Sequence, residues 1–222
     1  MGINEMYQIC QYAINKAQNG YLTPSQFNLL ANQAQISFQD YLLGEFQQYQ
    51  YGRPQARVNY SQNSDTRQRL TPFIIETTLT IDGNGLVNYP TNYLQTDSMR
   101  TTTDFDRIRF VQQDSLYSYL KSEIDPVATN PIYLLNDGGF QFYPKNIGSA
   151  TLTYVKVAPD MIWGYTLDDN GRPIFAPAYS TEPLWYDIDK LEIVARILKL
   201  VGVSLQDGQV EQYANMVTTQ GQ

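Results

Sequence analysis

The stretch from Leu184 to Val217 reads LWYDIDKLEIVARILKLVGVSLQDGQVEQYANMV and decides the fold class of this chain. Within it, residues 188–201 have the spacing of a single α-helix that carries two neighbouring apolar stripes. The first stripe consists of Ile188, Leu191, Val194, Ala195, Leu198 and Val201, and the second of Ile193, Ile197 and Leu200. A surface helix needs an apolar arc of only about 100°, and this helix has roughly twice that. We therefore expect it to lie at the centre of the fold or against a second chain.

The charged side chains of this helix are confined to one narrow row, made of Asp189, Glu192, Arg196 and Lys199. Glu192 precedes Arg196 by four residues, the order that favours an ion pair along a helix. One apolar stripe is enough to pack the helix inside its own subunit. The sequence therefore predicts that the second stripe, Ile193, Ile197 and Leu200, lies at a seam with another subunit or bundle.

Two further helices are expected near the amino-terminal end. Residues 3–18 have a broad apolar face, and Thr23-Pro24 has the residue types preferred at the N-cap and the first position of a helix. We expect this second helix to extend to about Gln50. Neither end of the chain can bury its apolar faces alone, so residues 1–50 and 184–222 are predicted to form one helical bundle.

The middle of the chain, residues 71–183, is predicted to be rich in β-strands. Apolar and polar residues alternate at 73–81, as in a half-buried strand. Further strands are expected at 86–89, at 107–112, in a hairpin at 131–144 and at 149–159, with a short helix at 114–124. Strands that are separated by turn residues in this way favour an antiparallel sandwich or barrel-like module, inserted between the helices. The expected fold class is α+β.

Between the helices and the strands, residues 51–70 have no clear periodicity. This segment holds four arginines, Arg53, Arg57, Arg67 and Arg69, in a chain whose net charge is −7. An exposed linker explains such a segment, and contact with nucleic acid is a third possibility. The functional hypothesis is an extended arm whose arginines contact an acidic neighbouring subunit.

The composition excludes most kinds of active site. The chain has no histidine and a single cysteine, Cys10, which rules out a Cys/His zinc site and any catalytic triad that needs histidine. We expect no enzyme activity, no cofactor and no metal. A net charge of −7 disfavours a surface that holds DNA by its phosphates, although it suits a wall past which DNA slides. No apolar run reaches the length of a membrane span, and no signal peptide is recognisable.

Three patterns could be taken for functional sites, and each has a simpler explanation. Residues 82–85 and 167–171 resemble calcium loops, but they lack the acidic twelfth position, so hairpin turns explain them better. Asp104 and Asp106 could form a catalytic carboxylate pair, yet alternating charges are ordinary on a strand. Trp163 and Trp185 could line a sugar site, although an aromatic seam between domains explains them better.

Two segments of the chain resemble a known family. They are YVKVAPDMIWGY at residues 154–165 and DIDKLEIVARILKLVGVSLQDGQVEQYA at residues 187–214. Both resemble the head-to-tail connector proteins of crAss-like tailed bacteriophages of the podovirus type, which form rings in the neck and tail. The match is most specific at residues 152–163 and 184–214, whereas residues 51–148 add little to it.

The resemblance implies a structural virion protein that is made in the host bacterial cytoplasm and built into the neck or tail. It implies a homo-oligomer, with a dodecameric ring that connects the portal protein to adjacent tail or ring proteins around the genome-ejection channel. Viral DNA would pass through that ring without specific binding, and no membrane would be involved. The alternatives are a carbohydrate- or receptor-binding module of a phage tail and an assembly or scaffolding factor.

Overall fold

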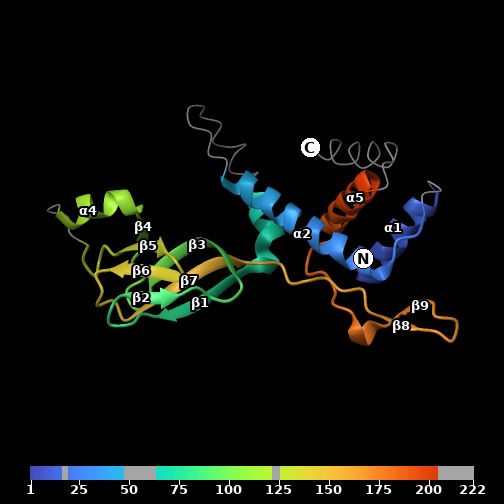
Figure 1. Cartoon of the computed structure of the whole chain (residues 1–222). Coiled ribbons are helices and arrows are strands. Elements are labelled where there is room, and N and C mark those ends of the chain that lie inside the picture. Colours follow the sequence, from blue (N-terminus) through green and yellow to red (C-terminus); the bar gives the residue numbers. More distant parts are fainter. Residues whose placement is uncertain (17–19, 48–63, 122–125, 205–222) are drawn as a thin grey trace, which may run out of the picture. The chain divides into compact units, whose positions relative to one another are not determined.

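The computed structural model describes residues 1–16, 20–47, 64–121 and 126–204 (Figure 1). Contacts within the chain divide it into two compact units. The first unit combines Met1–Pro72 with Ala158–Gln222, and the second is Phe73–Val157. Helices and antiparallel sheets are both present, so the predicted α+β class is confirmed.

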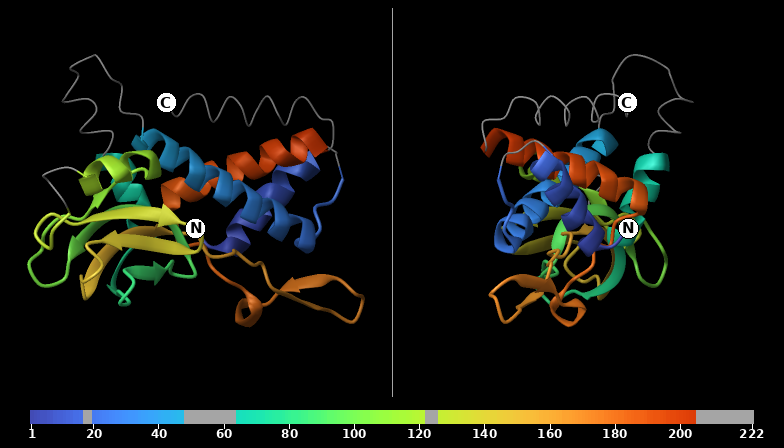
Figure 2. Two further views of the ribbon diagram at one scale, coloured as in Figure 1. Left: turned by 60° about the vertical axis from the view of Figure 1, so that its left-hand side comes forward. Right: turned by 90° about the vertical axis from the view of Figure 1, so that its right-hand side faces the viewer.

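The first unit is mainly helical. It contains α1 (Ile3–Lys16), α2 (Pro24–Gln47), helical residues 64–70, α5 (Asp187–Ser204), a hairpin of β8 (Tyr165–Leu167) and β9 (Pro173–Phe175), and the short η2 (Pro177–Tyr179). Figure 2 shows α5 crossing α2, and α5 contacts both α1 and α2. The two ends of the chain therefore share one helical unit, as the sequence predicts. The rest of the predicted helical end, residues 205–222, lies outside the described residues.

The start of α2 is fixed by a capping box. The Gln26 N–H donates to Thr23 Oγ1 at 3.4 Å, and Gln26 Oε1 accepts a hydrogen bond from the Thr23 N–H at 3.1 Å. Pro24 occupies the first helical position, where its missing N–H leaves no intrahelical bond unmade. The helix begins where the sequence predicts, and it continues through Gly44.

Amide side chains of α2 bind the extended segment at residues 158–163. Asn28 Oδ1 accepts a hydrogen bond from the Trp163 N–H at 2.7 Å, and Asn28 Nδ2 donates to the Trp163 carbonyl oxygen at 3.3 Å. Asn32 does the same at Met161, with distances of 2.8 Å and 3.1 Å. Each asparagine supplies both an acceptor and a donor to one backbone residue, so it replaces a residue of a neighbouring β-strand.

Two glutamines continue the same series. Gln35 Nε2 donates to the Pro159 carbonyl oxygen at 2.9 Å, and Gln39 Oε1 accepts from the Ala158 N–H at 3.0 Å. Four helical residues rise about 6 Å and two extended residues about 6.6 Å, so Asn28, Asn32 and Gln35 meet alternate residues of the segment. Gln39, one turn further along α2, binds the residue next to Pro159. We call these four side chains, Asn28, Asn32, Gln35 and Gln39, the amide ladder.

The amide ladder places Trp163 inside the helical unit. The indole Nε1 of Trp163 donates to Asn4 Oδ1 at 3.0 Å, and the centroid of its ring lies 4.3 Å from that of Tyr7. Trp185 is also buried in this unit. The expected aromatic seam between domains is therefore corrected, because both tryptophans pack within one unit. Their burial also removes them as an open platform for a sugar.

The second unit is a sandwich of two sheets with strand orders β1-β7-β3 and β2-β6-β5-β4. The strands are β1 (Ile74–Thr80), β2 (Leu86–Asn88), β3 (Tyr93–Thr101), β4 (Arg109–Phe110), β5 (Ile132–Asn136), β6 (Gly139–Tyr143) and β7 (Ser149–Lys156). Leu79 and Leu152 of one sheet share a buried cluster with Phe140 and Phe142 of the other. The helix α4 (Gln113–Lys121) covers the outer face of the second sheet through Leu116. The described strands form no closed barrel.

Most strands lie where the sequence predicts them, with three corrections. The turn at residues 82–85 does not close a hairpin, because β1 pairs with β7 whereas β2 pairs with β6 in the other sheet. The chain changes sheet there because the Phe142 N–H donates to the Gly85 carbonyl oxygen at 2.7 Å and holds the turn against β6. β4 is shorter than predicted. β3 was not predicted, since the run Thr96-Asp97-Ser98 in its middle hides the alternation.

Two predicted boundaries are also corrected. Residues 158–183 belong to the helical unit rather than to the β-rich part, because the amide ladder binds the chain as soon as it leaves β7. Residues 64–70 are helical rather than part of a linker. The rest of the predicted linker, residues 51–63, lies outside the described residues.

The amide ladder can be tested through Asn32→Ala. The change leaves the N–H and carbonyl groups of the buried Met161 without these partners. We expect the free energy of unfolding to fall by about 2 to 3 kcal/mol, measured by urea denaturation. The control Gln33→Ala, at an exposed position of the same helix, is expected to change it by less than about 0.5 kcal/mol. Equal midpoints for the two variants would contradict the role given to the ladder.

Candidate interaction surfaces

The second apolar stripe of α5 lies inside the subunit. Ile193 and Ile197 are fully buried, and Leu200 is half-buried. α5 packs against two helices rather than one, so its own subunit covers both stripes over most of its length. The expectation that Ile193 and Ile197 face another subunit is therefore not supported. The predicted pair of Glu192 and Arg196 is present, at 3.2 Å.

The unburied apolar surface of this helix lies at its start instead. Ile188 is 72% exposed and Leu191 is 57% exposed, and they lie one turn apart on the same side of α5. Leu184 and Tyr186, just before the helix, are exposed as well. We call these four residues the α5 start patch. The sequence pattern correctly indicated surplus apolar surface, but it assigned that surface to the wrong residues.

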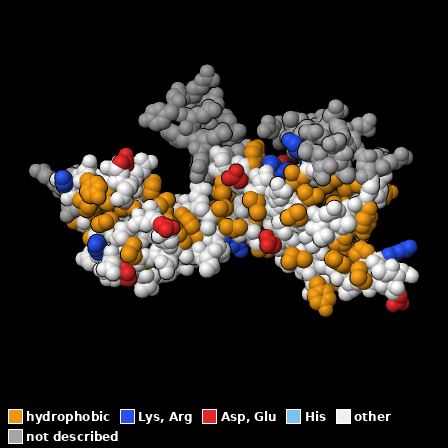
Figure 3. All heavy atoms as spheres, in the orientation of Figure 1, with side chains coloured by type: hydrophobic (Ala, Val, Ile, Leu, Met, Phe, Trp, Pro, Cys, Tyr) orange, Lys and Arg blue, Asp and Glu red, His pale blue; other side chains and the backbone are white. Residues whose placement is uncertain are grey.

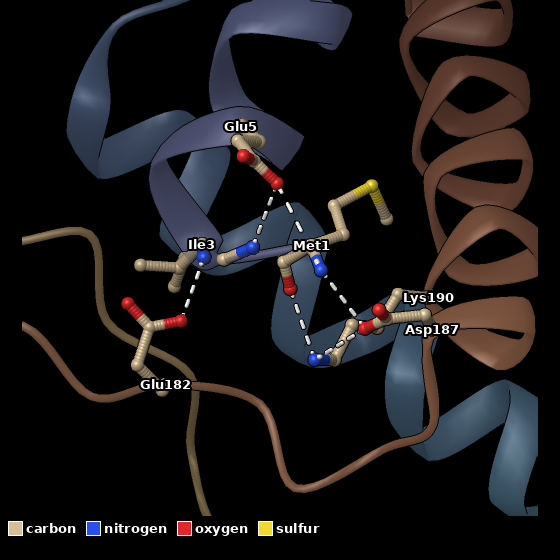
Figure 4. A network of polar contacts seen from close by, with 7 residues as sticks. Met1, Ile3, Glu5, Glu182, Asp187 and Lys190 are labelled. Atoms are coloured by element: carbon tan, nitrogen blue, oxygen red, sulfur yellow. Dashed lines mark hydrogen bonds and ion pairs between the residues drawn. The ribbon is translucent and has the colours of Figure 1, made fainter.

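Polar contacts fix the backbone beside this patch (Figure 4). Asp187 Oδ1 accepts hydrogen bonds from the amine of Met1 at 2.9 Å and from Lys190 Nζ at 3.1 Å. These hydrogen bonds lower the pKa of the Asp187 carboxyl. Glu182 Oε2 accepts from the Ile3 N–H at 2.8 Å, so acidic side chains hold the start of α1 beside the start of α5. The α5 start patch is therefore presented on a well-connected backbone.

The four arginines of the predicted arm do not share one role. Arg53 and Arg57 lie outside the described residues. Arg67 and Arg69 lie on the helical segment 64–70, and Arg69 Nε is 3.4 Å from Asp189 Oδ1 and 3.8 Å from Asp65 Oδ2. The acidic partner of Arg69 is therefore in its own chain, which corrects the expectation that this arginine reaches a neighbouring subunit.

Asp189 is an unusual partner because it is almost completely buried. The residue is 1% exposed, and within the described part of the chain neither carboxylate oxygen has a hydrogen-bond partner. Burial raises the pKa of the Asp189 carboxyl, and the positive charge of Arg69 only partly opposes this effect. Its place in the first turn of α5 favours the ionised form, since the N–H groups of a helix start are partly positive. The ion pair thus fixes helix 64–70 on α5 at a cost in desolvation.

The hairpin of β8 and β9 is a second exposed apolar element of the helical unit. All three residues of β8 are exposed, and so is Ile174 of β9. Figures 1 and 2 show the hairpin projecting beyond the helices, and apolar side chains reach the surface in this region in Figure 3. An isolated two-stranded hairpin is at best marginally stable in water. This one is mounted at its base, where the Ala176 N–H donates to the Gly164 carbonyl oxygen at 2.9 Å.

The two loops that resemble calcium sites share one turn geometry. Asp168 Oδ1 accepts hydrogen bonds from the N–H groups two and four residues later, at 2.9 Å and 2.7 Å. Asp82 Oδ1 makes the same pair of contacts, at 3.0 Å and 2.6 Å. Gly85 and Gly171 have positive φ angles at matching positions. The aspartates therefore act as turn acceptors, and the described residues contain no cluster of three or more potential metal ligands.

The remaining predicted carboxylate pair is also part of a turn. Asp104 is exposed and accepts a hydrogen bond from the neighbouring Thr103 hydroxyl, whereas the Asp106 backbone N–H donates to Thr101 Oγ1. No described helix is long and apolar enough to cross a membrane. The α5 start patch and the β8–β9 hairpin are two of the exposed apolar features of the helical unit.

No sequence model of a known protein family matches this chain, and no curated protein matches it either.

The buried carboxylate predicts a specific pH dependence. The pKa of the Asp189 carboxyl is raised in the folded state. As pH rises above about 4, this carboxyl therefore loses its proton in the unfolded chain before it does so in the folded chain. Wild-type stability contributed by Asp189 therefore falls as pH rises, until the folded carboxyl has ionised too. The variant Asp189→Asn lacks this effect. We therefore expect the difference in free energy of unfolding, variant minus wild type, to be larger at about pH 7 than at about pH 4. Urea denaturation at both pH values tests this, and a difference that shrinks toward pH 7 would be inconsistent with it.

The backbone packing at the base of the β8–β9 hairpin leaves no room for a side chain at Gly164. A Cβ at this position would overlap the carbonyl oxygen of Tyr179. We expect Gly164→Ala to lower the free energy of unfolding by about 1 to 3 kcal/mol and to expose the hairpin to proteolysis. The control Gly44→Ala lies on α2 with open space around it, and it should raise stability by about 0.5 to 1 kcal/mol. Thermal unfolding of both variants measures these stability changes. If both variants were stabilised, or both destabilised, the result would argue against tight packing at Gly164.

Proposed function

We propose that this chain is a structural protein of the neck or tail of a crAss-like tailed bacteriophage. Copies of it form a ring that connects the portal protein to the tail and surrounds the channel through which the genome leaves. The ring has no catalytic role and takes no cofactor. Within this proposal the protein is made in the host bacterial cytoplasm and then resides in the virion.

The observation that supports this proposal most is the α5 start patch. Ile188 and Leu191 belong to a helix whose other apolar residues are largely buried, yet both remain exposed. Exposing two such side chains forgoes burial that stabilises a folded chain by roughly 1.5 to 3 kcal/mol each. A second subunit that covers them recovers this free energy.

A second feature suits a ring in particular. Subunits of a ring meet head to tail, so each needs two different surfaces that complement one another. Separate exposed apolar elements of the helical unit include the α5 start patch and the β8–β9 hairpin. The net charge of −7 is also compatible with a channel wall that repels DNA instead of retaining it.

The proposal is tested by electron microscopy of the purified protein and of the phage particle that contains it. A closed ring around a DNA-filled channel is the expected result. A protein that is monomeric in solution and absent from the mature particle would contradict it, and absence from the particle alone would favour an assembly factor.

The double variant Ile188→Glu/Leu191→Glu tests the α5 start patch. Because both side chains are exposed in the subunit, the thermal stability of the monomer should change little, whereas buried charge at a subunit contact should prevent assembly. Analytical ultracentrifugation measures the assembly state. The control Leu29→Glu introduces a charge at an equally exposed apolar position of α2 and should leave assembly intact. Rings that form normally from the double variant would exclude the patch as a subunit contact.

A further inference from the structure

Along one edge of the β-sandwich, a full strand has no partner strand on its outer side among the residues that the structure describes. β1 is the outer strand of its sheet and pairs with β7 over all seven residues without a bulge. The Ile81 N–H donates to the Gly148 carbonyl oxygen at 3.2 Å, which extends this ladder by one hydrogen-bonded pair. Because hydrogen-bonded and non-hydrogen-bonded pairs alternate, the N–H and C=O groups of the even-numbered residues point away from β7. Those residues are Ile74, Glu76, Thr78 and Thr80.

The opposite edge of the same sheet is protected. β3 has register shifts between Tyr93 and Gln95 and between Thr96 and Ser98. Its far end is covered, since the Ile108 N–H donates to the Met99 carbonyl oxygen at 2.9 Å. Irregular and covered edges prevent pairing with other chains. β1 has neither form of protection, and Thr78 and Thr80 at its edge are exposed.

The hairpin of the helical unit offers a matching strand. The Asp168 N–H donates to the Arg172 carbonyl oxygen and the Ala176 N–H to the Gly164 carbonyl oxygen, both at 2.9 Å. By the same alternation, Tyr165 and Leu167 of β8 direct their N–H and C=O groups away from β9. Those groups have no partner among the described residues. On β9 the outward position 173 is a proline without an N–H, so β8 is the edge that is able to pair.

We propose that β8 of one copy of this chain adds to the open edge of β1 in the neighbouring copy and so extends its three-stranded sheet. Each copy contributes a different surface to this contact, the β8 edge from one copy and the β1 edge from the next. Contacts of this head-to-tail kind are the ones that close a ring. The β8–β1 contact deepens the proposed function and depends on it. In this contact the two-stranded β8–β9 hairpin gains β1 as a third strand. β8 consists of Tyr165, Thr166 and Leu167, so it carries no charged side chain that would repel Glu76 of β1.

Cross-linking between variants that each carry one added cysteine tests the pairing directly. Thr78→Cys places a thiol on β1 and Thr166→Cys places one on β8. Native Cys10 needs no removal, because burial raises the pKa of its thiol to about 12 and leaves it unreactive. With a short bismaleimide, a mixture of the two variants should give a cross-linked dimer, whereas each variant alone should give none. The double variant should give a ladder of multimers.

A proline at the open edge provides an independent test. Thr78→Pro removes an N–H that points away from β7, so the intramolecular ladder is kept. We expect self-association to weaken by about tenfold or more, measured by analytical ultracentrifugation. The matched control Thr78→Ala retains the N–H and should assemble like wild type. Thermal unfolding of both variants checks that the sandwich remains folded.

These experiments distinguish failure of the β8–β1 contact from failure of the proposed ring. Rings that form while the mixture fails to cross-link overturn the β8–β1 contact and leave the proposed function standing. Cross-linking of Thr78→Cys alone replaces the contact with self-pairing of β1, and a link only within one chain also overturns it. A wild-type chain that never self-associates overturns the proposed function and the contact together.

Discussion

The amide ladder is the interaction on which the rest of the helical unit depends. The chain leaves the central strand of the sandwich and is immediately bound along α2 by Asn28, Asn32, Gln35 and Gln39. Without those side chains, backbone groups of the buried residues Ala158, Met161 and Trp163 would lose these partners, a severe penalty in a protein interior. The ladder therefore decides where Trp163 enters the core and where the β8–β9 hairpin begins.

The helices were predictable because each carries a local signal. Thr23-Pro24 with Gln26 fixes the start of α2, and the apolar periodicity of residues 188–201 identifies α5. The same periodicity did not show which stripe would remain exposed. Both stripes fit a helix with two neighbours, and only the positions of α1 and α2 show that Ile193 is covered and Ile188 is not.

Non-local pairing was beyond the reach of sequence patterns. The turn at residues 82–85 has the composition of a hairpin, yet the partner of β2 is a strand more than fifty residues later. The amide ladder left a trace in the sequence, since its four members recur at helical spacing on a side of α2 that also buries Ala31 and Phe38. Amides on a buried helix face require partners, and this requirement could have indicated an extended segment bound there.

The amide ladder also has a consequence for the conditions under which the protein keeps its shape. Amide groups do not ionise between acidic and basic pH, and salt does not screen their short-range hydrogen bonds as it screens separated charges. The ion pair of Arg69 and Asp189 responds to both variables. The contact between α2 and residues 158–163 therefore remains at nearly constant strength across changes of acidity and ionic strength.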